Sequence, residues 1–224
     1  MEFRHELKHI LNYSDYFLLR KRLRHIMPPD PHAGPDGCYQ IRSLYFDDWR
    51  DHALREKLYG ISRREKFRLR LYNYDLSLIR LEKKVRRANL SHKESVLLTE
   101  SQARSILSGD WDWMRKSGTP LLVECYSKLT GQLLRPKTVV DYTREPFVFA
   151  PGNVRVTLDH HIRTGLLSTD FLNPNLVTVD AGGPVCIQEV KYDQFLPDLI
   201  RDAIQLDYRQ TSAFSKYAAC RLYG

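Results

Sequence analysis

Alternation between charged and apolar residues in several short segments constrains this chain more than any other feature of its sequence. Successive residues of a β-strand point to opposite faces of the sheet. If residues 66–72 form a strand, one face carries a lysine, two arginines and a tyrosine, and the other carries a phenylalanine and two leucines. The segment is therefore predicted to be a strand with one strongly cationic face and one apolar face.

The same pattern recurs in six segments. Every polar face carries at least one cation, four also carry a carboxylate, and three contain a Glu-x-Lys pair. A solvated outer face of an antiparallel sheet is the simplest alternative. However, the polar faces favour Arg, Lys and Glu over Ser, Thr and Gln, which favours a closed barrel with these faces turned inward. The segments are residues 3–8, 66–72, 79–85, 140–144, 154–159 and 187–192, and the pairs are Glu6/Lys8, Glu82/Lys84 and Glu189/Lys191.

The remaining pattern predicts an α+β fold: an antiparallel β-barrel of about eight strands with bracing helices, including a C-terminal helix. We expect a single domain over residues 1–224. The predicted strands are residues 3–11, 39–46, 65–74, 77–85, 138–149, 153–159, 176–179 and 186–192. The predicted helices are residues 15–25 capped by Ser14, 48–58, 100–107 opened by a capping box at Thr99, 196–204 and 213–222. Residues 27–37 read as a loop, and residues 121–128 fit neither strand nor helix clearly.

Composition limits the partner and the compartment. The net charge of +8 favours an anionic partner, whether nucleic acid, anionic lipid or a phosphorylated metabolite. The four cysteines are scattered singly and form no zinc motif, which indicates free thiols in a reducing, cytoplasmic setting. We find no signal peptide and no apolar run of about 18 residues, so membrane association is expected only through a partner.

An inward array of cations is costly unless an anion fills it. Arginine forks match phosphate oxygens, and lysines act as point charges. The interleaved glutamates can pair with the cations, or hold a divalent metal that bridges phosphates. Phosphoryl transfer needs mainly positioning and charge neutralisation. The pattern therefore predicts a thin, highly anionic, metal-bridged ligand.

With this ordered set of charged strands, the sequence resembles the VTC-type polyphosphate polymerase domains of the triphosphate tunnel metalloenzyme (CYTH-like) superfamily. The similar stretches run nearly from end to end. They are residues 6–8, 43–47, 67–70, 81–84, 142–144, 154–159, 189–191 and 214–217. The resemblance implies an antiparallel barrel open along its axis, which would form the tunnel.

The resemblance also implies roles for individual residues. Arg68, Arg70, Lys84 and Glu189 would be catalytic. The phosphate or nucleotide would be bound by Lys8, Arg68, Arg70, Lys84, Lys93, Tyr142, Arg144, Arg155, Lys191, Ser215 and Lys216. Glu189 would hold Mn²⁺ or Mg²⁺, with Glu6 and Glu82 as further candidates. Lys93 is placed by the resemblance alone, because the stretch from Asn89 through residues 91–94 reads as a loop.

The implied reaction transfers the terminal phosphoryl group of ATP to a growing inorganic polyphosphate. Residues 43–47 and 214–216 favour this polymerase over a tunnel-fold hydrolase of tripolyphosphate or nucleoside triphosphates. A non-catalytic binder of polyphosphate or inositol phosphates also remains open. The basic run at residues 83–87 could contact nucleic acid, but its alternate members already point inward, so we expect no nucleic-acid partner. His160 and His161 are not expected to share a metal ion, because strand neighbours point in opposite directions.

Overall fold

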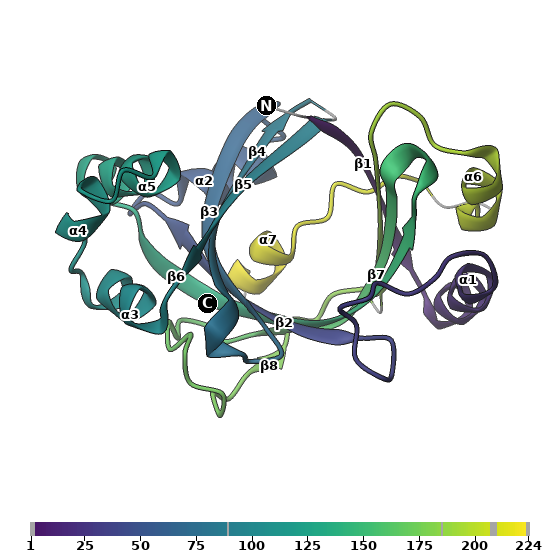
Figure 1. Ribbon diagram of the computed structural model, residues 1–224, viewed down its shortest axis with the longest axis horizontal. Coiled ribbons are helices and arrows are strands. Elements are labelled where there is room, and N and C mark those ends of the chain that lie inside the picture. The colour runs from purple at the N-terminus through teal and green to yellow at the C-terminus, as the bar shows by residue number, and fades with distance from the viewer. Residues whose placement is uncertain (1–2, 89, 185, 207–209, 223–224) are drawn as a thin grey trace.

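The protein is described by a computed structural model that covers residues 3–88, 90–184, 186–206 and 210–222. In these residues, nine antiparallel strands form one sheet with the order β6-β2-β3-β4-β5-β1-β9-β7-β8, and pairing of β6 with β7 closes eight of them into a barrel (Figure 1). β8 is an extra strand that pairs with β7. The strands are β1 Arg4–Leu11, β2 Tyr39–Asp47, β3 Arg63–Tyr72, β4 Ile79–Arg87, β5 Leu90–Leu98, β6 Arg135–Phe149, β7 Val154–Thr164, β8 Val179–Asp180 and β9 Cys186–Tyr192.

Helices pack on two opposite sides of the barrel, and one helix enters it. Figure 1 shows α3, α4 and α5 on one side, α1 and α6 on the other, and the C-terminal α7 inside the ring of strands. The α-helices are α1 Tyr13–Ile26, α2 His52–Leu58, α3 Glu100–Ser108, α4 Asp112–Arg115, α5 Pro120–Gly131, α6 Asp198–Ile204 and α7 Lys216–Arg221; the short 3-10 helices are η1 Leu76–Leu78 and η2 Pro151–Asn153. The predicted α+β barrel with a C-terminal helix is confirmed. None of the described helices combines the length and apolar character needed to span a membrane.

Strand parity places two of the three apolar clusters outside the barrel. Phe67, Leu69 and Leu71 of β3 are at most 2% exposed and join the cluster formed with α3, α4 and α5. A second cluster packs α1 and α6 against β1, β7 and β9. A third seats the apolar side of α7, through Tyr217 and Cys220, against the inner wall of the barrel. Because the apolar faces point outward to helices, the charged faces of the same strands point inward.

The predicted starts of α1 and α2 are wrong because side chains bind backbone amides at other positions. α1 begins after Asn12 rather than Ser14: Asn12 Oδ1 accepts the Asp15 amide at 2.8 Å, and the Asp15 carboxylate accepts the Asn12 amide at 3.4 Å. α2 begins at His52 rather than at Asp48, because Asp48 Oδ1 accepts the Arg50 and His52 amides in the preceding turn. The capping box at Thr99 is confirmed, and it opens α3.

The other differences lie in strands and in the last helix. Residues 91–94, read as loop, belong to β5, while Asn89 lies outside the described residues. The predicted strand at residues 176–179 reduces to the two-residue β8, because only Val179 and Asp180 pair with β7. Residues 121–128 lie within α5. The C-terminal helix begins at Lys216 rather than at residue 213, because Ser215 caps it by accepting the Ala218 amide.

Candidate functional site

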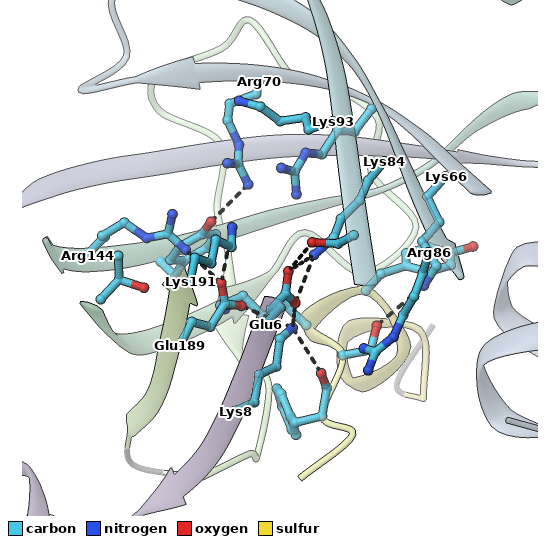
Figure 2. A pocket seen from close by; sticks show the side chains of 18 of the residues that line it. Glu6, Lys8, Lys66, Arg70, Lys84, Arg86, Lys93, Arg144, Glu189 and Lys191 are labelled. Atoms are coloured by element: carbon cyan, nitrogen blue, oxygen red, sulfur yellow. Dashed lines mark hydrogen bonds and ion pairs between the residues drawn. The ribbon is translucent and has the colours of Figure 1, made fainter. Parts of the chain in front are cut away.

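A cavity of about 510 Å³ lies inside the barrel, lined by inward side chains of the strands and by the start of α7 (Figure 2). Every predicted site residue lines it except Glu82, whose fully buried carboxylate pairs with the cavity-lining Arg68, Arg70 and Lys93. It is also lined by five cations that were not predicted as site residues: Arg4, Lys57, Arg64, Lys66 and Arg86. In the described part of the chain, its carboxylate lining consists of Glu6 and Glu189, so positive charge is in large excess.

Glu6 and Glu189 share one cation at the centre of the cavity. Lys8 Nζ lies 3.3 Å from Glu6 Oε1 and 3.1 Å from Glu189 Oε1, as the dashed lines in Figure 2 show. Lys84 Nζ also lies 2.6 Å from Glu6 Oε2. Burial disfavours the charged form of Glu6, but Lys84 and Lys8 outweigh it and hold the pKa of Glu6 far below its usual range. Both carboxylates are therefore ionised and close enough to bind the same cation.

Glu82 on β4 organises the arginines of β3. Its Oε2 accepts hydrogen bonds from Arg68 Nε at 2.8 Å and Nη2 at 2.6 Å, and its Oε1 accepts one from Lys93 Nζ at 2.9 Å. The side chain is fully buried, and Arg68 and Arg70 hold the pKa of Glu82 well below its usual range against the effect of burial. Both oxygens of Glu82 are thus engaged by cations.

A second buried network joins α7 to the barrel wall. Arg144 of β6 donates two hydrogen bonds to Asp159 of β7, at 2.6 and 2.7 Å. Lys216 Nζ, at the start of α7, lies 2.6 Å from Asp159 Oδ2 and 3.5 Å from Glu189. Burial opposes the charge on Lys216, but Asp159 and Glu189 outweigh it and raise the pKa of Lys216. Parity placed Asp159 on a polar face, but its role as the buried partner of two predicted phosphate ligands was not anticipated.

Hydroxyl groups orient the remaining guanidinium groups. Arg70 donates to Ser43 Oγ at 3.2 Å and to the Tyr142 hydroxyl at 2.9 Å. Arg68 donates to the Tyr45 hydroxyl at 2.9 Å. The Tyr142 hydroxyl therefore helps to orient the Arg70 guanidinium group in the cavity.

Arg155 is held by the loop at residues 27–37, for which the sequence suggested no role. Its Nη2 donates to Asp30 Oδ2 and to the Tyr39 hydroxyl, both at 2.6 Å. The Asp30 amide bonds to the Pro146 carbonyl of β6, which fixes the loop against the barrel. The loop thus positions one of the predicted phosphate ligands.

Two lysines show that the cavity holds more positive charge than its carboxylates balance. Lys66 Nζ lies 3.4 Å from Ser215 Oγ and 4.8 Å from the Tyr217 ring centroid. Burial, reinforced by Arg64 and Lys8, lowers the pKa of Lys66 to about 7. Burial also lowers the pKa of Lys84 to about 8, although Glu6 partly opposes that shift. A bound polyanion would stabilise both lysines in their charged forms.

A family model, the VTC domain, matches residues 3–223. The chain belongs to the VTC domain family. No curated protein matches it in sequence. Among solved structures, this VTC domain is similar to a putative adenylyl cyclase from Hippeastrum described as having a dominant triphosphatase activity. Identity is 13%, the alignment covers 98% of this chain and 95% of that one, and the TM-score is 0.56.

Two further structures are more distant from this VTC domain. One is a putative adenylate cyclase from Bacillus halodurans, with 14% identity, coverage of 85% and 80% of the two chains, and a TM-score of 0.46. The other is a protein from Pyrococcus horikoshii, with 14% identity, coverage of 90% and 84%, and a TM-score of 0.43. The Hippeastrum structure supports the tunnel fold, which the resemblance implied.

The VTC domain departs from simple parity at two positions. His160 and His161 were expected to point apart, yet their Nδ1 atoms lie 3.1 Å from each other. The pairing of β6 with β7 shifts register between Asp141 and Thr143, and His161 has a left-handed φ of 51°. This bulge turns the His161 side chain back toward His160.

Of the residues that sequence reasoning missed, some carried a usable signal. Lys66 already stood on the cationic face of residues 66–72 but was not assigned to the site, and extending the alternation of β3 by one step would have found Arg64. Arg4 also shares a parity face with Glu6 and Lys8 on β1, whereas Lys57 lies on α2, where no alternation distinguishes it from a surface cation.

Proposed function

We propose that this VTC domain is a polyphosphate polymerase that transfers the terminal phosphoryl group of ATP to an inorganic polyphosphate chain and releases ADP. The observation that carries the proposal is the cationic cavity enclosed by the barrel, where burial and neighbouring cations lower the pKa values of Lys66 and Lys84. An enclosed channel of this kind suits a thin polyanion better than a folded nucleic acid. ATP and polyphosphate are the proposed partners, in the cytoplasm.

The side chains act through position and charge. Arg68, Arg70 and Lys84 would hold the phosphoryl group that is transferred. Arg144, Arg155 and Lys191 would bind the phosphoryl groups next to it. Lys93, Ser215, Lys216 and Lys8 would extend the contacts along the bound chain. The attacking atom is a phosphate oxygen of the acceptor, so the protein supplies no nucleophile. Fixed guanidinium and ammonium groups stabilise charge that develops in the transition state, without reorganising during the reaction.

The carboxylates of the cavity fit a divalent metal. Glu6 and Glu189 both contact Lys8 Nζ within 3.3 Å, so their hard oxygen donors converge on a single cationic position. We assign Glu189 as the principal ligand of Mn²⁺ or Mg²⁺, with Glu6 beside it. The bound ion would neutralise charge on the phosphate oxygens. Because both Glu82 oxygens are engaged by Arg68 and Lys93, we assign Glu82 to positioning those cations.

Contacts between β2 and α7 favour the polymerase. Tyr45 stacks on Tyr217 with ring centroids 5.0 Å apart, and the Tyr217 hydroxyl donates to Asp47 Oδ2 at 2.7 Å. The two segments that most resemble the VTC-type polymerases thus build one wall of the cavity. A tunnel-fold triphosphatase is the second candidate, favoured by the activity described for the Hippeastrum protein.

The deciding experiment incubates the purified protein with ATP and Mn²⁺ and separates the products on a polyphosphate gel. A ladder of chains with matching ADP release supports the polymerase. Free phosphate without a ladder assigns the triphosphatase, and tight anion binding without turnover assigns a non-catalytic binder.

The variant Glu189→Gln tests the metal assignment. It should abolish turnover while leaving much of the anion affinity, because the arginines remain in place. Glu124→Gln is the matched control, since Glu124 lies on α5 outside the barrel and pairs with Lys83. Full turnover in Glu189→Gln would contradict the assignment.

A further inference from the structure

A cluster of three metal-binding side chains lies on the outer wall of the barrel, away from the cavity. One ligand atom each of Cys38, Glu145 and His160 lies within 4.8 Å of the other two. Cys38 directly precedes β2, Glu145 belongs to β6 and His160 to β7, so the cluster joins three neighbouring strands. Glu145 and His160 follow Arg144 and Asp159 in sequence, and they therefore point outward where those two point toward the inside of the barrel.

The cluster contains buried polar atoms that the protein leaves unsatisfied. Glu145 is 1% exposed. Its Oε1 accepts from Arg20 Nε at 2.6 Å and from the Tyr16 hydroxyl at 3.2 Å. Its Oε2 is buried and makes no hydrogen bond of normal geometry among the described residues, although the Cys38 thiol interacts with this carboxylate; His160 Nε2 is likewise buried without a hydrogen bond. A buried polar atom without a partner is costly, and two of them in one cluster indicate a missing ligand.

We propose that Cys38, Glu145 and His160 form a Zn²⁺ site on the outer wall of the barrel, distinct from the Mn²⁺ or Mg²⁺ position in the cavity. A thiolate, an imidazole and a carboxylate are the donor set that zinc takes, and three protein ligands leave a fourth position for water. Mn²⁺ and Mg²⁺ prefer oxygen donors, as the two glutamates of the cavity supply.

The surroundings already hold the ligands as a zinc site requires. Arg20 and Tyr16 of α1 fix Glu145 through Oε1, which leaves Oε2 for the metal. His160 Nδ1 lies against His161, and the Tyr16 ring lies 5.4 Å from the His160 ring, which leaves Nε2 for the metal. Burial, together with the Glu145 and Asp36 carboxylates, raises the pKa of Cys38 to about 12, so Zn²⁺ must displace the thiol proton as it binds.

The test uses Co²⁺ as a spectroscopic probe of the full chain with its thiols reduced. Titration should give the intense near-ultraviolet thiolate-to-cobalt absorption and the visible bands of a tetrahedral ion, and Zn²⁺ should then displace the Co²⁺. Cys38→Ser should abolish the thiolate band. His160→Gln and Glu145→Gln should weaken binding by at least the roughly 10–100-fold that loss of a supporting partner costs a metal site.

Two control variants separate this site from the rest of the molecule. Cys125→Ser alters a buried cysteine of the α5 cluster, and Glu189→Gln alters the cavity. Both should keep the thiolate band. Absence of the band in the wild type, its persistence in a folded Cys38→Ser, or its loss in Glu189→Gln would each overturn the proposal. If Cys38→Ser does not fold, wild-type binding together with the His160→Gln result decides.

Discussion

The two faces of strand β3 use opposite kinds of chemistry. Outward, Phe67, Leu69 and Leu71 pack among α3, α4 and α5 with almost no exposure. Inward, Lys66, Arg68 and Arg70 crowd one another in a cavity with few carboxylates. Apolar burial stabilises the fold, whereas the clustered cations destabilise it unless a bound anion compensates their charge. The comparison teaches that in this barrel stability and function lie on opposite sides of the same backbone.

The outer face should dominate stability. Leu69→Ala removes a fully buried side chain and should lower the free energy of unfolding by about 4 kcal/mol, through lost burial and the cavity left behind. Activity per folded molecule should be nearly unchanged. Urea denaturation and an activity assay at low temperature measure the two effects. A large loss of specific activity in the folded fraction would contradict the conclusion that the outer face sets stability and not activity.

The inner face should dominate activity. Arg70→Met removes a guanidinium group held by Ser43 and Tyr142, and should lower turnover on the order of 10²–10³-fold. The free energy of unfolding should change by only about 1 kcal/mol, because the lost hydrogen bonds are offset by relief of the repulsion from Arg68. Steady-state kinetics and urea denaturation measure the two effects. A large loss of folding stability with unchanged turnover per folded molecule would contradict the functional role of the inner face.

Burial of two inner lysines, reinforced by neighbouring cations, should make stability depend on pH. The folded-state pKa values of Lys66 and Lys84, about 7 and 8, lie below the usual lysine value of 10.5, so the unfolded chain binds more protons between these limits. This contribution raises stability as pH rises from about 7 to about 10.5. Melting temperatures without ligand should follow that trend, and Lys66→Met should flatten it.

Saturating tripolyphosphate should reduce the same dependence, because the anion keeps both lysines charged. Calorimetry in buffers of different ionisation enthalpy should then show proton uptake on binding near pH 8. If protons are released on binding, or if none are taken up, the pKa values of Lys66 and Lys84 are not lowered in the empty cavity.

The smallest effect is expected where charges meet on the outer face. Glu124 of α5 pairs with Lys83 of β4, and its side chain remains 34% exposed. Because solvent screens such a pair, Glu124→Gln should cost at most about 1 kcal/mol and leave turnover unchanged. Thermal denaturation measures the change. A loss of stability comparable to that of Leu69→Ala would show that this exposed ion pair matters as much as the apolar core.

Where one face is apolar, alternation was sufficient to predict the barrel and the inward cations of its strands, while the resemblance supplied their proposed roles. It failed at β5, where His92 and Glu94 interrupt the apolar face and hide the strand that carries Lys93. The apolar side chains of α5, Leu121, Leu122, Cys125 and Leu129, follow a helical period, but the even spacing of Glu124, Tyr126 and Lys128 obscured it. Asp30 could not be assigned, because its partner Arg155 is 125 positions away in the chain. Such contacts depend on how the barrel closes rather than on local pattern.

A crystal structure with a non-hydrolysable ATP analogue and Mn²⁺, with anomalous scattering to locate the manganese, would show where the triphosphate binds. We expect the triphosphate inside the barrel against Arg68, Arg70, Lys84 and Arg144, with manganese bound to Glu189. A triphosphate bound outside the barrel, or manganese away from both Glu189 and Glu6, would contradict this expectation.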